Sequence, residues 1–289
     1  LNDEIIAKIN KLAKRVGAPS YQKTPVFKRN HYHGKNKKKE NISNADWAAI
    51  RNFKKTKLEK NVEGLGAQID KIRSYLNKLI DKNYDEISEC IISIIKDIIK
   101  EGDDDALEKV GKHIFEIGSL NKFWSILYAR LYKDLIINFG IMKEICVKNF
   151  DSFEDLFNNI NYVDPQSDYN KFCEYNKENE KRRALSSFFI ICAGYDIIDK
   201  NRMEMIIINF INKVNINIKL EGQINLIEEI VMNIGVMISK GLTIIQTFKQ
   251  YDFIKNQIEY FSIMNSKKFP SLSQKIVFKF MDMHDEMED

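Results

Sequence analysis

The sequence has few residues that interrupt helices. Its 289 residues include only 4 prolines and 12 glycines, and no proline occurs between Pro25 and Pro165. Proline removes a backbone donor and clashes with the preceding turn, so it ends or kinks a helix. We therefore expect many helices joined by short connections rather than a strand-rich fold. The chain is long enough to bury a substantial core.

Signals for membranes, secretion and metal binding are also scarce. No run reaches the roughly 18 apolar residues of a membrane span, and no secretory signal opens the chain. Cys90, Cys146, Cys173 and Cys192 are scattered without metal-ligand spacing, which favours free thiols in a reducing compartment. We expect a cytoplasmic protein with no membrane partner. Because the first residue is Leu1 rather than methionine, we also expect a fragment or a processed product.

Catalytic motifs are missing as well. Neither Gly-x-x-x-x-Gly-Lys-Ser/Thr, Gly-x-Ser-x-Gly nor His-Glu-x-x-His occurs. His31 and His33 have no cysteine or carboxylate at ligand spacing, and His113 falls in an apolar helical run, so solvated or structural histidines are the simplest interpretation. Glu228 and Glu229 are adjacent, so on a helix they project about 100° apart and do not face each other. We expect no enzymatic activity, no cofactor and no metal.

What the chain does have is an uneven distribution of charge. Residues 1–60 carry 16 Lys and Arg against 5 Asp and Glu, whereas residues 61–289 carry 29 against 36. This divides the chain into a basic, largely extended N-terminal arm (1–60) and a mildly acidic helical body (61–289). Within the arm we expect a short amphipathic helix over 1–16, followed by a flexible linker.

The basic residues of the arm form two clusters with aromatic neighbours. Phe27 and Tyr32 are interleaved with the first cluster, and Trp47 precedes the second. Flexible cations neutralise phosphates and aromatic rings stack on unpaired bases, so we predict that the arm contacts RNA. The alternative is a solvated linker whose charge only aids solubility. The predicted RNA-binding residues are Lys28, Arg29, Lys35, Lys37, Lys38, Lys39, Arg51, Lys54, Lys55 and Lys57.

The body is a series of segments with helical apolar spacing. The clearest covers 84–100, where isoleucines recur at the 3, 4 and 7 spacing of one buried face. Ten such segments pair into five antiparallel hairpins of about 40–47 residues, the period of HEAT-type repeats. We predict an all-α fold, an α-solenoid of about five HEAT-type helix pairs; a closed bundle would need fewer and longer helices. The expected helices cover 67–79, 84–100, 106–118, 122–138, 141–160, 171–196, 199–214, 221–241, 243–264 and 271–286.

The segment 122–135 combines aromatic and charged residues in a way that fits either a ligand site or a helix in a core. Its apolar residues fall at i, i+3, i+4, i+7 and i+11, which predicts one buried face. Arg130, Lys133 and Asp134 occupy what is left of the helix surface. The expected core residues are Trp124, Leu127, Tyr128, Leu131 and Leu135, widened by Ile126, Ala129, Tyr132 and Ile136.

Five segments of the body, taken in order, resemble one known family. They cover 72–86, 123–135, 180–190, 231–235 and 271–282. In this order and with this number of helices, the body resembles the middle domain of eukaryotic translation initiation factor 4G, an α-solenoid of five HEAT repeats. The sharpest element is Ile72-Arg73-Ser74-x-Leu76-Asn77-Lys78-Leu79.

The resemblance implies a scaffold rather than a catalyst. Members of the family bind a DEAD-box RNA helicase, initiation factor 4A, and hold its two lobes in a near-closed orientation that speeds its ATP cycle. The implied helicase contacts are Leu76, Leu79 and Tyr84. Trp47 is the only candidate for the upstream anchoring tryptophan of some members, and its polar surroundings suit an exposed anchor. Docking of Trp47 onto the chain's own first repeat is the alternative.

Several positions depart from the family pattern. The closing Arg-Ile-Arg-Phe is Lys-Ile-Val-Phe at 275–278, the Gly-Asn after the double arginine is Ser-Ser at 186–187, and a usual glutamate is Ala193. These changes weaken the implied contact with the second helicase lobe. Together with the excess of isoleucine, asparagine and lysine, they fit a divergent member from a protist or a giant DNA virus.

Three functions follow as hypotheses. The leading one is a translation initiation scaffold that stimulates a factor-4A-type helicase and contacts mRNA through the basic arm. The second is a related middle-domain protein of splicing, nonsense-mediated decay or ribosome assembly that clamps a different DEAD-box helicase. The third is a simple RNA-binding module with the solenoid as spacer. A cap-binding protein is a further candidate partner, although the only related motif, Tyr21 to Phe27, carries Pro25 inside the expected helix.

Overall fold

The structure is a computed structural model that describes residues 3–16, 64–100, 104–121, 123–158 and 160–288. Among these residues every regular element is a helix. The chain divides into two compact units, residues 1–58 and 59–289. In the first unit, helix α1 (Asp3–Val16) has acidic residues in its first turn and basic residues in its last, which complements the helix dipole. The helix predicted over 1–16 is therefore confirmed within the described residues.

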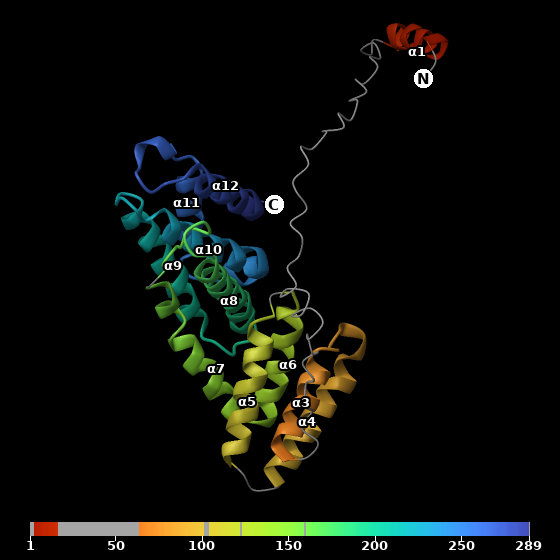
Figure 1. Cartoon of the computed structure of the whole chain (residues 1–289), viewed down its shortest axis with the longest axis vertical. Coiled ribbons are helices and arrows are strands. Elements are labelled where there is room, and N and C mark those ends of the chain that lie inside the picture. The colour runs from red at the N-terminus through yellow and green to blue at the C-terminus, as the bar shows by residue number, and fades with distance from the viewer. Residues whose placement is uncertain (1–2, 17–63, 101–103, 122, 159, 289) are drawn as a thin grey trace, which may run out of the picture. The chain divides into compact units, whose positions relative to one another are not determined.

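The described part of the second unit contains ten α-helices and three short 3₁₀ helices (Figure 1). The α-helices are α3 (Gly64–Leu76), α4 (Tyr84–Lys100), α5 (Asp104–Ser119), α6 (Ser125–Asn138), α7 (Ile141–Asp151), α8 (Tyr169–Gly194), α9 (Lys200–Asn217), α10 (Ile224–Ile245), α11 (Tyr251–Ser262) and α12 (Gln274–Glu288). The 3₁₀ helices are η1 (Asp81–Asn83), η2 (Glu154–Phe157) and η3 (Ser266–Lys268). The all-α prediction is confirmed for the described residues.

The helices of this unit pack in two layers. Neighbours in sequence pair as α3 with α4, α5 with α6, α9 with α10 and α11 with α12. Alternate helices then stack: α4, α6, α8, α10 and α12 follow one another in one layer, while α3, α5 and α7, and then α9 and α11, stack in the other. Each helix thus buries its apolar face against its partner and the next pair, an arrangement compatible with an α-solenoid.

Aromatic rings fill the space where α7, α8 and α9 meet. The ring of Phe189 on α8 lies 5.2 Å from those of Phe150 on α7 and Phe153 just after it. Phe157 at the end of η2 lies 4.5 Å from Phe210 on α9. The two contacts of Phe189 are edge-to-face, a favoured geometry for aromatic pairs. Large rings therefore join these three helices, and their burial anchors the middle of the unit.

The single helix expected over 141–160 is wrong, because α7 ends at Asp151 and η2 follows. The hydroxyl of Ser152 donates to the carbonyl oxygens of Lys148 and Asn149, both at 3.3 Å. These are the acceptors that the next backbone N–H groups of a continuing helix would need. A serine side chain that bonds back to its own helix competes with the helix in this way.

The break expected near Gly241 is instead a kink within α10, which continues to Ile245. Gly241 has non-helical dihedrals, φ −139° and ψ 23°, and a Cβ at this position would overlap Ile190 of α8. The helix expected over 243–264 is therefore wrong in its boundaries, since α11 begins only at Tyr251. The buried carboxylate of Glu204 accepts the N–H of Gln250 and so caps the start of α11.

In the segment 122–138, the predicted core residues that are buried all lie within α6. Leu127, Tyr128, Leu131 and Leu135 are buried on α6, as predicted. Trp124 precedes the helix and is 47% exposed, so its assignment to the core was wrong. The assignment of Ile126, which is 56% exposed, was wrong as well. α6 begins at Ser125, so Trp124 precedes the helix, and Ile126 lies on the exposed side of its first turn while Ser125 and Leu127 are buried.

Candidate functional site

The predicted residues of the N-terminal arm lie outside the described residues. They are Trp47 among the helicase contacts, and Lys28, Arg29, Lys35, Lys37, Lys38, Lys39, Arg51, Lys54, Lys55 and Lys57 among the RNA contacts. Their roles stay predictions. The site described below is therefore built from the helical body alone.

The other three predicted helicase contacts are core residues. The side chains of Leu76, Leu79 and Tyr84 are only 1%, 4% and 2% exposed. The chain's own helices cover these side chains, and their role as helicase contacts stays a prediction. The physical reason is that the apolar positions of the motif are those that pack α3 against α4. Whether this segment binds a helicase through its other residues stays a prediction.

The turn between α3 and α4 does present residues to solvent. Lys78, Asp81 and Lys82 are exposed, and the apolar side chain of Ile80 is 42% exposed. Asn83 fixes the turn, since its Oδ1 accepts the N–H of Ile80 at 2.8 Å and its Nδ2 donates to the carbonyl of Lys78 at 2.8 Å. An apolar side chain flanked by cations on a fixed turn is a suitable contact point for a partner.

Tyr84 ties this turn to α6. Its hydroxyl donates to Asp134 at 2.6 Å, and the guanidinium of Arg130 lies 3.8 Å from the centre of its ring. Burial raises the pKa of Tyr84 well above its usual value, and the hydrogen bond to Asp134 adds to that shift. Tyr84 therefore stays neutral and positions the start of α4.

The first two family-like segments are joined by a hydrogen bond. The hydroxyl of Tyr128 on α6 donates to the backbone carbonyl of Leu76 at the end of α3, at 2.9 Å. The bond is buried, and it adds a second donor to a carbonyl at the helix end that also accepts the N–H of Leu79 at 3.2 Å. Tyr128, within the family-like segment 123–135, thus has a structural role next to the first segment.

The second and third segments meet at a pair of serines. The hydroxyls of Ser125 on α6 and Ser187 on α8 share a buried hydrogen bond of 2.8 Å. Next to it, the hydroxyl of Ser186 donates to Oδ1 of Asn233 on α10 at 2.7 Å. The Ser186-Ser187 pair, one of the departures from the family pattern, therefore links α8 to both of its neighbours in the layer.

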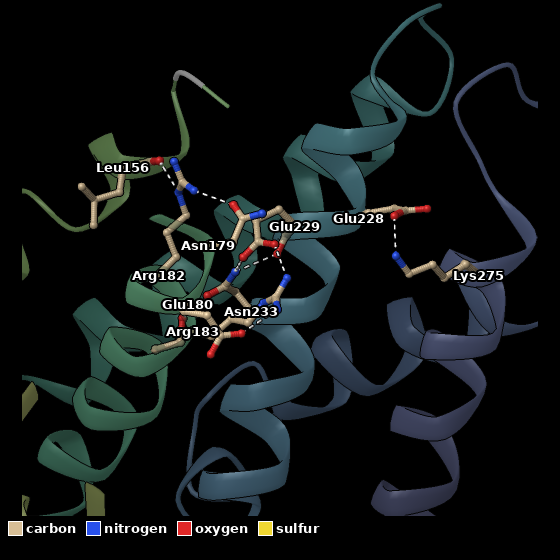
Figure 2. A network of polar contacts seen from close by, with 10 residues as sticks. Leu156, Asn179, Glu180, Arg182, Arg183, Glu228, Glu229, Asn233 and Lys275 are labelled. Carbon is tan, nitrogen blue, oxygen red and sulfur yellow. Dashed lines mark hydrogen bonds and ion pairs between the residues drawn. The ribbon is translucent and has the colours of Figure 1, made fainter. Parts of the chain in front are cut away.

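A partly buried ion pair joins α8 to α10 beside the contact of Ser186 with Asn233 (Figure 2). Nη2 of Arg183 on α8 lies 2.6 Å from Oε2 of Glu229 on α10, and Nδ2 of Asn233 donates to Oε1 of the same carboxylate at 2.8 Å. Glu229 is only 2% exposed. Burial raises the pKa of Glu229, while Arg183 and then Asn233 oppose that rise by stabilising the carboxylate.

Arg182 points away from this pair and anchors the segment after α7. Its Nε donates to the carbonyl oxygen of Leu156 at 2.7 Å, and its Nη1 donates to Oδ1 of Asn179 at 2.7 Å (Figure 2). Burial lowers the pKa of Arg182, and the carboxylates of Glu229 and Glu178 oppose that shift. The two adjacent arginines thus serve two different contacts.

Glu228, three residues before the fourth segment, joins α10 to the fifth segment. Its carboxylate accepts a hydrogen bond from Ser273 at 3.0 Å and pairs with Lys275 of α12 at 2.6 Å (Figure 2). Glu229 faces α8 while Glu228 faces α12, so the two carboxylates do not converge, as their adjacency predicted. Lys275, the first residue of the closing motif at 275–278, is the cation of the ion pair with Glu228.

Together these contacts link the first four segments in order, and Glu228, three residues before the fourth segment, links α10 to the fifth. Only part of this arrangement was predictable from the sequence. The double arginine and the Ser-Ser pair were noted as motifs, but nothing in the local spacing indicated that Ser186, Asn179 and Asn233 would be buried. Ser186 and Asn233 are partners that stand on different helices, 47 positions apart in the chain. A single sequence carries no signal for contacts of this range.

A separate groove opens between α5, α7, α8 and the connection from α5 to α6. Its volume is about 910 Å³, and it is lined by apolar and charged side chains. Phe115 and Leu185 are the buried apolar residues of its lining, and Leu120 and Phe123 are exposed at it. The sequence pattern did not predict this groove, because its lining comes from three helices and a loop.

Two further features are reported for the described residues only. They contain no cluster of three or more His, Cys, Asp or Glu side chains that could hold a metal ion. They also contain no helix that is both long enough and apolar enough to span a membrane. In comparisons with known proteins, no protein-family model matches the chain and no curated protein matches it.

Proposed function

We propose that this chain is a scaffold resembling initiation factor 4G, which binds a DEAD-box RNA helicase of the factor 4A type in the cytoplasm and stimulates it. Its body would be five HEAT-type helix pairs, and its basic arm would contact mRNA. The proposal rests on a resemblance in sequence. The structural observation that supports it is that hydrogen bonds join the first four family-like segments in order, while Glu228, three residues before the fourth segment, pairs with Lys275 of the fifth.

The segments on α6, α8, α10 and α12 occupy successive helices of one layer. Hydrogen bonds connect the first four segments in order, from Leu76 with Tyr128 to Ser186 with Asn233. Glu228, just before the fourth segment, pairs with Lys275 of the fifth. The packing of these helices one on the next places the segments in a single stack. The motifs therefore behave as parts of one architecture, which supports a common origin with the family they resemble.

A layered stack of helices also suits the proposed activity. Holding two lobes of a helicase in one orientation needs a rigid support whose contact points are separated along its length. Buried polar contacts between successive helices provide such rigidity, because their geometry allows little sliding of one helix on the next. We place the helicase contact at the exposed turn of Lys78, Ile80, Asp81 and Lys82 rather than at the buried Leu76, Leu79 and Tyr84.

The test is the RNA-dependent ATPase rate of a factor-4A-type helicase, measured with the full chain added at increasing concentration. We expect the wild-type chain to raise the rate. The double substitution Ile80→Asp with Lys82→Glu should weaken the apparent affinity about tenfold or more, because loss of a central apolar anchor costs over about 1 kcal/mol.

The matched control is Ile99→Asp with Lys96→Glu at the other end of α4. Ile99 is 43% exposed, against 42% for Ile80, and Lys96 is exposed like Lys82. This control should stimulate as the wild type does, and both variants should keep the wild-type circular dichroism. A wild-type chain that leaves the ATPase rate unchanged would refute the proposal. Equal losses in the two variants would refute the placement of the contact at the turn.

A further inference from the structure

Helix α1 has an apolar face that is largely open to solvent. Ile5 and Leu12 are 45% and 62% exposed, and Ile6 and Ile9 are only partly buried. At about 100° per residue these four side chains fall within roughly 120° of the helix circumference, so they form one stripe. None of the four belongs to the apolar core of the described residues or to the side chains packed against it. The stripe is therefore a surface that another apolar phase can cover.

Every charged residue of α1 after its first turn is a cation. The cations are Lys8, Lys11, Lys14 and Arg15, all exposed. No ion pair between residues that the structure describes includes any of them. The two carboxylates, Asp3 and Glu4, lie in the first turn, where the helix dipole stabilises them. Residues 5–16 thus carry four positive charges and no negative charge, which selects an anionic partner.

The cations wind around the helix instead of forming one row. Each step of three residues, from Lys8 to Lys11 to Lys14, turns the side chain by about 60°, from beside the apolar stripe to the opposite side. The rim of a protein groove that held the stripe could pair with Lys8 and Arg15 only. A planar anionic surface attracts all four cations, because its field extends about 8 Å into solution at physiological salt, close to the width of a helix.

We propose that α1 lies in the surface of a membrane that contains anionic phospholipid, with its apolar stripe among the acyl chains and its cations at the headgroups. Interfacial amphipathic helices adopt this arrangement and bury their apolar face by about 5–10 Å. The expectation of no membrane partner considered spanning segments, and a helix that lies in the surface plane needs none. The contact would hold the chain at a membrane and is independent of helicase stimulation.

Single-stranded RNA is a poorer partner for α1. Its phosphates would meet the cations, but α1 contains no aromatic residue on which a base could stack. Binding of RNA would also leave the aliphatic stripe in water. An anionic lipid surface satisfies the apolar face and the cations of the helix at the same time.

The test is co-sedimentation of the full chain with phosphatidylcholine vesicles that contain about 30% phosphatidylserine, at physiological salt. Vesicles of phosphatidylcholine alone are the reference. We expect binding to the anionic vesicles to be at least about tenfold tighter, because each cation near an anionic surface strengthens binding roughly fivefold.

Substitutions in the stripe distinguish insertion of α1 from electrostatic attraction of the basic arm as a whole. Ile5→Gln with Leu12→Gln removes two apolar side chains without changing the charge, and it should weaken binding to the anionic vesicles at least about tenfold. The matched control is Ile137→Gln with Ile216→Gln on α6 and α9, whose side chains are 73% and 62% exposed. This control should bind as the wild type does.

A second pair of variants tests the cations. Lys8→Gln with Lys11→Gln should weaken binding to the anionic vesicles at least about tenfold, since two charges leave the helix that contacts the lipid. Lys177→Gln with Lys181→Gln removes the same charge from two exposed lysines of α8 and should leave binding unchanged. Glutamine is a good helix former, so all four variants should keep the wild-type circular dichroism.

Four outcomes would overturn the proposal. The first is a wild-type chain that does not bind the anionic vesicles, which would leave the stripe to an acidic groove of a partner protein. The second is equal binding to both kinds of vesicle. The third is binding that Ile5→Gln with Leu12→Gln leaves unchanged, which would assign the contact to cations alone. The fourth is an equal loss in the α1 variants and their matched controls. None of these results bears on helicase stimulation, which is measured separately.

Discussion

The α3–α4 pair and the α8–α10 pair both pack through buried side chains, but the two sets of side chains differ in polarity. Between α3 and α4 the buried residues are almost all aliphatic, with isoleucine at most core positions of α4. Between α8 and α10 the buried residues include an ion pair and hydrogen-bonded serine and asparagine side chains. Apolar contacts have no preferred direction, whereas a buried hydrogen bond forms in one arrangement only.

The difference shows how one molecule combines stability with a defined geometry. Aliphatic burial supplies a large favourable free energy but tolerates small shifts of one helix on another. The polar contacts of α8 add little net stability, because both partners lose water. What they contribute is a fixed register between successive helices of the layer. We infer that the filling of space by apolar side chains sets the position of α3 against α4, whereas polar contacts set the position of α8 against α10.

The largest effect is expected from shortening the aliphatic core of the first pair. The double substitution Leu76→Ala with Leu79→Ala should lower the free energy of unfolding by about 4 kcal/mol or more, since each buried Leu→Ala change costs about 2–5 kcal/mol. The measurement is urea unfolding followed by circular dichroism. Any loss of helicase stimulation in this variant would then reflect unfolding rather than a lost contact.

The control for this substitution is Ile80→Ala in the adjacent turn. Ile80 is 42% exposed, so its truncation should change the free energy of unfolding by no more than about 0.5 kcal/mol. Should the Leu76 and Leu79 double variant unfold at the wild-type urea concentration, the core assignment of these residues would be wrong.

The second largest effect on stability is expected from the ion pair of Arg183 with Glu229. Arg183→Met should lower the free energy of unfolding by about 3 kcal/mol, because it leaves the Glu229 carboxylate buried without its cation. Burial already raises the pKa of Glu229 in the folded protein, and loss of Arg183 removes the main opposing effect. The folded variant therefore prefers the protonated acid, so its stability is greatest at low pH and falls as the pH rises through that raised pKa. Urea unfolding over a range of pH measures both effects.

The double substitution Arg183→Met with Glu229→Met separates charge from packing. Buried Nε of Arg183 has no hydrogen-bond partner among the described residues, so the native pair is incompletely satisfied. Replacing both partners by apolar side chains should recover most of the loss, as it often does for buried pairs. A double variant as unstable as Arg183→Met would show that volume, not charge, determines this interface.

The smallest effect is expected at His113, a polar contact between α5 and the first pair. Its Nε2 accepts a hydrogen bond from Nη2 of Arg73 at 2.9 Å. Burial lowers the pKa of His113, and Arg73 lowers it further, while Glu116 and Asp70 oppose the shift. Because the unfolded chain takes up the proton more readily, this contribution is complete above a pH of about 6.5 and is lost as the pH falls through the lowered pKa.

His113→Gln should remove that part of the pH dependence and leave the rest unchanged. The measurement is the urea midpoint of wild type and variant at several pH values between about 5 and 8. A difference between the two proteins that does not change with pH would contradict the assignment. The contact of His113 with Arg73 would then not account for any pH dependence of stability at the first pair.

Most of the helical framework was predictable because its signal is local. The isoleucines of α4 repeat at the helical period, and the boundaries expected for that helix, 84 and 100, agree with the structure. The errors fall where a neighbour overrides the local pattern. Ile190 of α8 approaches Gly241 and turns an expected break into a kink, and the Ser152 hydroxyl ends α7 early.

The candidate site was predictable only in outline. The segment around Leu76 was identified from a resemblance, but apolar residues in a motif can serve either a core or a contact, and the pattern does not distinguish the two. The exposed side chains of the turn, such as Ile80, become recognisable only once α4 covers Leu76 and Leu79. The groove beside Phe123 had no local signal at all, since three helices and a loop create it.

The sequence alone therefore determined the helical class, the approximate order of the helices and the division of charge between arm and body. These depend on composition and on spacings of three or four residues. The tertiary structure decided which polar residues are buried and that Arg183 pairs with Glu229. It also decided that Trp124 and Phe123 lie at the surface. Such outcomes depend on residues tens of positions away in the chain, and only packing of the layers brings those residues together.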